Sequence, residues 1–134
     1  MPKRRDAKPR LLHTSITVKD MDASIAFYQR QMGMKLEGRN EIKENNAEIA
    51  FLSAPGTSHL VELTWWRDKK EFVEGDQLDH IAFGVSDIDR FVARAKKDGV
   101  EVAKEPYTLG GGRHQIAFIK DLNGIWIELI EGRR

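Results

Sequence analysis

The sequence contains an internal repeat, and this feature constrains the fold more than any other. The segments that begin at His13 and at His80 both place Val five residues, Asp seven residues and a second Asp nine residues after the histidine. A helical pattern of apolar residues follows in each segment and stops at a glycine, Gly33 or Gly99. Self-similarity of this kind indicates two copies of one supersecondary unit.

The second part of each segment also matches. Residues 49–52 read Ile-Ala-Phe-Leu, and residues 116–119 read Ile-Ala-Phe-Ile. A turn dipeptide follows, Pro-Gly or Asn-Gly, and then a strand that carries one glutamate, Glu62 or Glu128. Each unit therefore has one helix among several strands. The sequence predicts an α+β fold in which two β-α-β-β-β repeats form a curved mixed sheet, with the helices outside and the cleft inside completed in a dimer.

The expected organisation is one domain behind a charged arm. Residues 1–10 hold five basic residues and one acidic residue, and we expect them to form a flexible basic arm. Residues 11–134 are expected to form the domain, with repeat 1 over about 11–64, a crossing segment over 65–78 and repeat 2 over about 79–131.

Composition excludes several classes of protein. The chain has no cysteine, which excludes disulfides, thiolate metal sites and a cysteine nucleophile. No apolar run approaches the roughly 18 residues that a bilayer span needs. No aromatic stacking platform or basic helix follows the basic arm. We therefore expect a cytoplasmic protein that binds neither nucleic acid nor a membrane.

Four residues at equivalent positions of the repeat carry the chemistry. The separation from His13 to Glu62 is 49 residues, and that from His80 to Glu128 is 48 residues. Because side chains alternate between the two faces of a strand, all four project from the face opposite their mostly apolar neighbours. If those apolar neighbours pack under the helices, the four residues face the cleft.

Two imidazoles and two carboxylates in one cleft predict a site for a divalent metal ion. Unpaired buried carboxylates are costly, and a cation offsets that cost. Imidazole nitrogen and carboxylate oxygen suit Zn, Ni, Co, Mn or Fe(II), and the lack of sulfur ligands argues against a closed structural zinc site. The other two histidines, His59 and His114, lack this pattern and are expected to be loop or surface residues.

Nearly the whole chain, from Leu11 to Glu131, resembles the vicinal-oxygen-chelate superfamily and, within it, glyoxalase I (lactoylglutathione lyase) of the short bacterial type. The stretches that carry the resemblance are Leu-Leu-His-Thr at 11–14, Ser-Ile-Ala-Phe-Tyr at 24–28, Met-Gly-Met-Lys-Leu at 32–36, Val-Glu-Leu-Thr at 61–64, Asp-His-Ile-Ala at 79–82, Ile-Ala-Phe at 116–118 and Lys-Asp-Leu-Asn-Gly-Ile-Trp-Ile-Glu-Leu-Ile at 120–130.

The resemblance implies a metal-dependent lyase of methylglyoxal detoxification. Its substrate would be a 2-oxoaldehyde hemithioacetal, isomerised by proton transfer through a metal-bound enediolate. The resemblance places four residues on the metal-ligand positions of the family: His13, Glu62, His80 and Glu128. The expected metal ion is Ni, Co or Zn, and Mn or Fe is compatible. Glu128 would be the catalytic base, with Glu62 as the carboxylate on the opposite side of the metal. It also implies a homodimer in which each site takes one half from each subunit.

The resemblance leaves the thiol open. Thr17 stands where glyoxalase I usually has an arginine that binds the glutathione carboxylate, and Trp66 stands where it has an asparagine. Lys104 falls near a basic glutathione-contacting position, and Gly110–Gly112 resembles the mobile loop over the site. Trp126 shares a strand face with Glu128 and is the best-placed aromatic residue to line a substrate pocket. Further candidates for that pocket are Trp65 and Phe72.

Three other functions remain open from the sequence. An extradiol-type dioxygenase of the same superfamily uses two histidines and one carboxylate on Fe(II), and Glu62 as a fourth ligand argues against it. An epimerase acting on an acyl thioester would also abstract a proton beside a chelated carbonyl. A metal-free drug-binding resistance protein would lack the four ligands, so their presence disfavours it.

Overall fold

The computed structural model describes residues 8–73, 75, 77–108, 112 and 114–132, and it contains two units of the same topology. The first unit consists of β1 (His13–Thr17), α1 (Met21–Met32), β2 (Lys35–Ile42), the short 3-10 helix η1 (Lys43–Asn45), β3 (Ala47–Ser53) and β4 (Leu60–Trp66). The second consists of β5 (Ile81–Val85), α2 (Ile88–Lys97), β6 (Val102–Thr108), β7 (Gln115–Lys120) and β8 (Trp126–Glu131).

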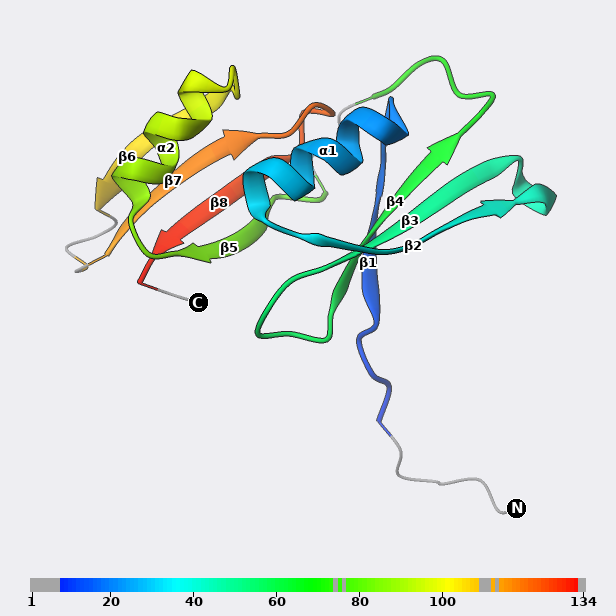
Figure 1. Cartoon of the computed structure of the whole chain (residues 1–134), viewed down its shortest axis with the longest axis horizontal. Helices are drawn as coiled ribbons and strands as arrows, with labels where there is room; N and C mark the ends of the chain where they lie inside the picture. The colour runs from blue at the N-terminus through cyan, green and yellow to red at the C-terminus, as the bar shows by residue number, and fades with distance from the viewer. Residues whose placement is uncertain (1–7, 74, 76, 109–111, 113, 133–134) are drawn as a thin grey trace.

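Each unit forms its own four-stranded sheet. The strand order is β1-β4-β3-β2 in the first sheet and β5-β8-β7-β6 in the second (Figure 1). In both sheets the first strand of the unit pairs in parallel with the last, and the other pairs are antiparallel. The prediction of an α+β fold made of two β-α-β-β-β repeats is confirmed, with the strands in two four-stranded mixed sheets where one curved mixed sheet was expected.

The repeated aspartate and glycine of each unit mark the ends of its helix. Asp20 and Asp87 are the N-cap residues, and the side chain of each accepts a hydrogen bond from the backbone N–H three residues later, at 2.9 and 3.1 Å. Gly33 ends α1 with a φ of 64°, and Gly99, just beyond α2, has a φ of 81°. These left-handed angles favour glycine, so the repeat preserves the helix boundaries.

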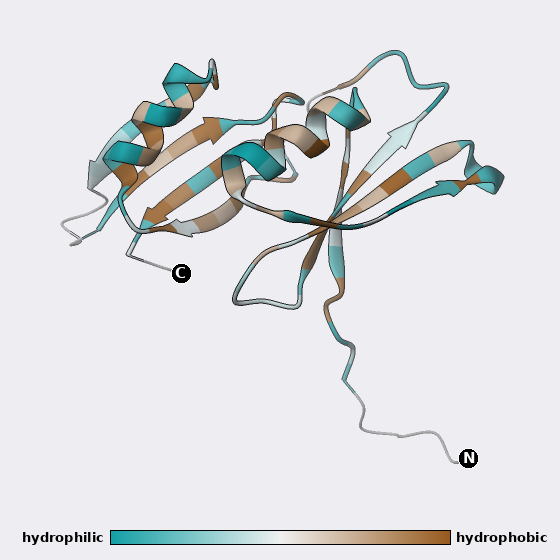
Figure 2. Ribbon diagram, viewed as in Figure 1, coloured by the Kyte–Doolittle hydropathy of each residue, from teal (hydrophilic) through white to brown (hydrophobic). Residues whose placement is uncertain are grey.

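A single hydrophobic core runs through both repeats on the helix side of the sheets. In β4 the buried residues include Val61 and Leu63, and in β8 they are Ile127 and Leu129. Figure 2 shows hydrophobic segments along the central strands of both sheets and hydrophilic positions over much of α2. The opposite face of each sheet has no helix packed on it among the described elements, and it is this face that carries the polar residues described below.

Buried polar contacts join the two repeats. The Tyr28 hydroxyl of α1 donates a hydrogen bond of 2.7 Å to Asp121, in the turn between β7 and β8. Burial, and then the negative charge of Asp121, raise the pKa of Tyr28 far above its ordinary value, so the hydroxyl keeps its proton. Asn123 donates to Ser24 at 3.2 Å and accepts from the backbone N–H of Lys19 at 2.8 Å. We call these five residues the junction. It fixes α1 against the second sheet.

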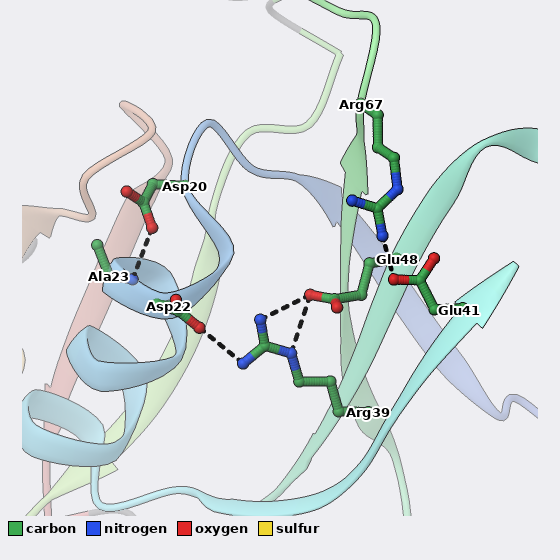
Figure 3. Close-up of polar contacts among 7 residues, drawn as sticks. All are labelled: Asp20, Asp22, Ala23, Arg39, Glu41, Glu48 and Arg67. Atoms are coloured by element: carbon green, nitrogen blue, oxygen red, sulfur yellow. Dashed lines mark hydrogen bonds and ion pairs between the residues drawn. The ribbon is translucent and has the colours of Figure 1, made fainter.

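Ion pairs at the surface join α1, β2 and β3 of the first unit (Figure 3). Arg39 on β2 lies 2.7 Å from both Asp22 on α1 and Glu48 on β3. The hydrogen bonds that it donates to Glu48 and Asp22 raise the pKa of its guanidinium above the ordinary value. A second pair joins Arg67 to Glu41. Surface pairs of this kind contribute only about 0–1 kcal/mol each, so the buried junction is the stronger constraint.

One strand boundary differs from the expected one. Strand β4 continues through Trp65 and Trp66, the first two residues of the expected crossing segment, because both pair with β3. Strand β6 begins at Val102 and contains Pro106. A proline is tolerated there because β6 is an edge strand, on which a missing N–H need not interrupt the ladder.

Some predictions fall outside the described residues. They are residues 1–7 of the expected basic arm and residues 110 and 111 of the glycine run. Within the part of the chain that the structure describes, no helix has the length and apolar character needed to cross a membrane.

Candidate metal centre

The first pair of predicted ligands, His13 and Glu62, lies on the neighbouring strands β1 and β4. His13 opens β1, and Glu62 lies in the middle of β4, where the parallel pairing places Ser15 opposite it. His13 Nε2 lies 3.8 Å from Glu62 Oε1. The His13 side chain is 39% exposed and the Glu62 side chain 15% exposed. The imidazole is therefore accessible, whereas the carboxylate is mostly shielded from water.

The second pair of predicted ligands, His80 and Glu128, repeats this arrangement between β5 and β8. His80 directly precedes β5, and Glu128 lies opposite Ala82 in the parallel pairing, as Glu62 lies opposite Ser15. His80 Nε2 lies 3.1 Å from Glu128 Oε1. The exposed fractions of the two side chains, 33% and 16%, are close to those of the first pair. The equal register explains why one spacing recurs in both halves.

A phenylalanine lies beside each pair of ligands, and sequence reasoning missed it. Phe51 of β3 pairs with Glu62, and its ring meets the His13 ring edge-on with the centroids 5.3 Å apart. Phe118 of β7 pairs with Glu128 and meets His80 in the same way, at 5.7 Å. The signal was present in the Ile-Ala-Phe repeat. We define a half-site as His13, Phe51 and Glu62, or the equivalent three residues of the second repeat.

Hydroxyl groups support the glutamate of the first half-site alone. Ser15 Oγ and Thr64 Oγ1 lie 2.7 Å apart, and Thr64 Oγ1 donates a long hydrogen bond of 3.4 Å to Glu62 Oε1. The equivalent positions in the second repeat are Ala82 and Ile130, which have no hydroxyl to donate. Glu128 therefore lacks this support.

A carboxylate supports the histidine of the second half-site alone. Asp79 Oδ1 lies 2.7 Å from His80 Nδ1. The equivalent position in the first repeat is Leu12, an exposed apolar residue. The two half-sites thus have the same ligands but different supporting groups.

The structure brings the four predicted ligands together in two pairs. Within residues 8–132, apart from the undescribed positions, no group of three or more His, Cys, Asp or Glu side chains lies close enough to hold a metal ion. The set of four is not assembled inside one chain.

The donor chemistry of each pair fits a divalent cation. Glu62 and Glu128 are largely shielded from water, and among the described residues the only ion-pair partner of each is a histidine. A shielded carboxylate that lacks a lysine or arginine partner is costly, and a cation offsets the cost. Imidazole nitrogen and carboxylate oxygen are ligands for Zn, Ni, Co, Mn or Fe(II).

A cavity of about 860 Å³ lies between the end of β1, the start of β8 and the segment that follows β4. Thr17 and Trp126, two of the predicted substrate-binding residues, line it, and so does Phe72. Lys19 and Lys69 also line it, with their ammonium groups 5.8 and 5.6 Å from the centre of the Phe72 ring. The cavity therefore combines an aromatic wall with two lysines and one carboxylate, that of Asp79.

The other two predicted substrate-binding residues lie outside this lining. Trp66 ends β4 and is 38% exposed. The ammonium group of Lys104 lies 5.7 Å from the centre of the Phe118 ring, which places Lys104 beside the second half-site. Trp65, also suggested for a pocket, packs against the core and against Arg67 instead.

Comparison with known families decides the relationship. The model of the Glyoxalase/Bleomycin resistance protein/Dioxygenase superfamily matches residues 10–129. The chain belongs to this superfamily. Relatives within it match almost end to end. A protein of Vibrio cholerae named probable lactoylglutathione lyase is 39% identical over 127 residues, which are 93% of this chain and 92% of the relative.

Solved structures of superfamily members support the same relationship. The glyoxalase I of Leishmania major, described as trypanothione-dependent, is 32% identical with a TM-score of 0.77, and the match covers 92% of this chain and 87% of that one. The glyoxalase I of Zea mays is 30% identical with a TM-score of 0.83 over 93% of this chain. This chain spans 45% of the maize chain, about half its length.

The remaining histidines of this superfamily member lie away from the half-sites. His59, in the loop before β4, contacts Thr14 Oγ1 through Nε2 at 2.9 Å, on the strand face opposite His13. Its Nδ1 is buried and has no partner among the described residues. His114 is exposed just before β7. Both are loop residues, as expected.

Proposed function

We propose that this protein is a metal-dependent glyoxalase I-type lyase. Its substrate is the hemithioacetal formed from a 2-oxoaldehyde and a thiol, and its product is the corresponding 2-hydroxyacyl thioester. The observation that carries the proposal is the His–Phe–Glu half-site, present twice at one register. The names of the relatives, which match over almost their whole length, support the same reaction.

In this proposal His13, Glu62, His80 and Glu128 hold one divalent ion, with Ni, Co or Zn favoured. A single chain presents two half-sites, so two chains are needed to supply four ligands to each ion. A homodimer with C2 symmetry would do this twice, pairing the first half-site of one subunit with the second half-site of its partner. The separation of the pairs within one chain supports this arrangement.

The reaction moves a proton between two adjacent carbons. When bound, the metal would polarise the two neighbouring oxygens of the substrate and so make the C–H group more acidic. Glu128 removes the proton from one carbon and returns it to the next. It is better suited to this role than Glu62, because no hydroxyl among the described residues holds it in place. Phe118 packs edge-on against His80 and limits the motion of that ring while Glu128 moves.

The substrate binds through its thiol portion in the cavity beside Thr17 and Trp126. Lys19 and Lys69 supply positive charge there, which suits a thiol that carries carboxylates. Thr17 offers no charge, so we expect the glutathione adduct to bind with a high KM. Because low-molecular-weight thiols stay reduced in the cytoplasm, we propose that the reaction takes place there.

One experiment tests the proposal. Purified protein is stripped of metal, reloaded separately with Ni, Co or Zn, and assayed on methylglyoxal with glutathione, with a second low-molecular-weight thiol and with no thiol. Thioester formation that needs both the metal and a thiol is expected. Activity without a thiol, or no activity with any metal, would contradict it. A monomeric mass at micromolar concentration with full metal content would contradict the shared site.

A further inference from the structure

Both ring nitrogens of His80 are engaged, which is not so for His13. Nδ1 lies 2.7 Å from Asp79 Oδ1, and Nε2 lies 3.1 Å from Glu128 Oε1. The imidazole therefore has a carboxylate oxygen close to each ring nitrogen, and Phe118 meets it edge-on at 85°. In the first half-site, the contacts of the His13 ring with described residues are the one with Glu62 at 3.8 Å and the edge-on one with Phe51.

The fold does not require Asp79. Its side chain is 88% exposed, and its contact with His80 is its only hydrogen bond or ion pair among the described residues. It lies just before β5 and outside the strand ladder. Asp79 also lines the cavity described above. Its one polar contact among the described residues is thus with a predicted metal ligand, which points to a role at the site rather than in the stability of the sheet.

We propose that Asp79 is a positioning residue for the metal centre, acting through His80. An ionised carboxylate can only accept hydrogen bonds, so the hydrogen between Asp79 and His80 belongs to Nδ1. That tautomer leaves the lone pair of Nε2 available for a metal ion. Partners of this kind fix the orientation of a ligand histidine and increase its basicity. The inference rests on the proposed metal centre.

The position of Asp79 also gives it a role while the reaction proceeds. In the proposed function Glu128 moves toward the substrate, and the Nε2 side of His80 then loses its carboxylate neighbour. Asp79 contacts the opposite nitrogen, so its hydrogen bond does not depend on where Glu128 lies. His80 therefore stays in place as a ligand while the glutamate beside it acts as a base.

Titration with Co²⁺, followed by visible absorption, tests the inference. The variants are Asp79→Ala, Asp79→Asn and, as the matched control, Leu12→Ala at the equivalent exposed position of the first repeat. We expect Asp79→Ala to weaken Co²⁺ binding about 10- to 100-fold. Asp79→Asn, which keeps a neutral acceptor oxygen, should weaken it less, and Leu12→Ala should not change it. Thermal unfolding of the metal-free variants should match the wild type.

The outcomes separate the two proposals. If the wild-type protein binds no Co²⁺, the metal centre itself is wrong, and the role of Asp79 with it. If the wild type binds Co²⁺ and Asp79→Ala binds equally well, the metal centre stands and only the role of Asp79 is overturned. An equal loss in Leu12→Ala would also overturn it, because the effect would then not depend on the carboxylate.

A second readout is independent of metal affinity. Histidine labelled with ¹⁵N reports which ring nitrogen carries hydrogen in the zinc-loaded protein. We expect the Nδ1–H signal of His80 to be protected from exchange with water in the wild type and to lose that protection in Asp79→Ala. Equal protection in both proteins would contradict the inference.

Discussion

The two half-sites share their ligands but differ in the groups behind them. In the first, hydroxyls of Ser15 and Thr64 support Glu62, and no described carboxylate contacts the other nitrogen of His13. In the second, Asp79 supports His80. The residues equivalent to Ser15 and Thr64 are Ala82 and Ile130, which have no hydroxyl to support Glu128. One repeat thus fixes its glutamate and the other fixes its histidine. A duplicated site can therefore stay symmetric in its ligands while the groups that contact those ligands differ.

Replacing Glu128 should separate the roles of the two glutamates most strongly. We expect Glu128→Gln to lower kcat by about 10²- to 10⁴-fold, because a positioned general base contributes that much. Rates are measured at saturating metal and substrate. Glu62→Gln is the matched control, since it also removes a carboxylate ligand, and it should weaken metal binding while lowering kcat less. Equal losses of kcat in both metal-saturated variants would show that the glutamates do not differ.

Removing an imidazole should have the second-largest effect, a loss of bound metal. His80→Ala removes the ligand that Asp79 supports, so we expect bound metal after dialysis to fall by about tenfold or more. Elemental analysis gives the metal-to-protein ratio. His59→Ala removes a histidine outside the half-sites and should leave that ratio unchanged. Full metal content in His80→Ala would show that the second half-site does not belong to the metal centre.

Disturbing the junction should lower stability without changing either half-site. Tyr28→Phe leaves the buried Asp121 carboxylate without its hydroxyl donor, which should reduce the free energy of unfolding by about 1–3 kcal/mol. Urea denaturation measures the change. Tyr107→Phe, on edge strand β6, is the control and should stay within about 0.5 kcal/mol of the wild type. Similar values for the two variants would mean that the junction contributes little.

Making the first half-site resemble the second should have the smallest effect. Thr64→Val removes the hydroxyl near Glu62 with almost no change of shape. A hydrogen bond of this kind is worth about 0.5–1.5 kcal/mol, so we expect the Kd for Co²⁺ to rise roughly two- to tenfold. Thr108→Val, exposed on β6, is the control. An unchanged Kd would show that the hydroxyls do not support the ligand.

Much of the fold could be predicted because the repeat presents each signal twice. Asp20 and Asp87 begin the helices, and the glycines after them occupy left-handed positions. Strand alternation also placed the two histidines and two glutamates on the face opposite their apolar neighbours, and the structure groups them as two pairs on that face. Two equal patterns reduce the number of topologies that a chain can adopt.

The supporting groups could not be predicted in the same way. Phe51 and Phe118 read as core residues, because only the register of β3 on β4 and of β7 on β8 places them beside the histidines. Asp79 has no counterpart in the first repeat, so the repeat could not single it out. The contact between Tyr28 and Asp121 depends on tertiary packing, which no local pattern encodes.

The junction also has a consequence for the order in which the chain folds. Every strand pairing stays inside one repeat, so each sheet can nucleate from contacts that are local to its own half of the chain. Contacts between distant residues are reached more slowly, because the intervening chain must first be ordered. Tyr28 and Asp121 are 93 residues apart. We therefore expect the junction to close late in folding and to make two separately nucleated halves unfold as one cooperative unit.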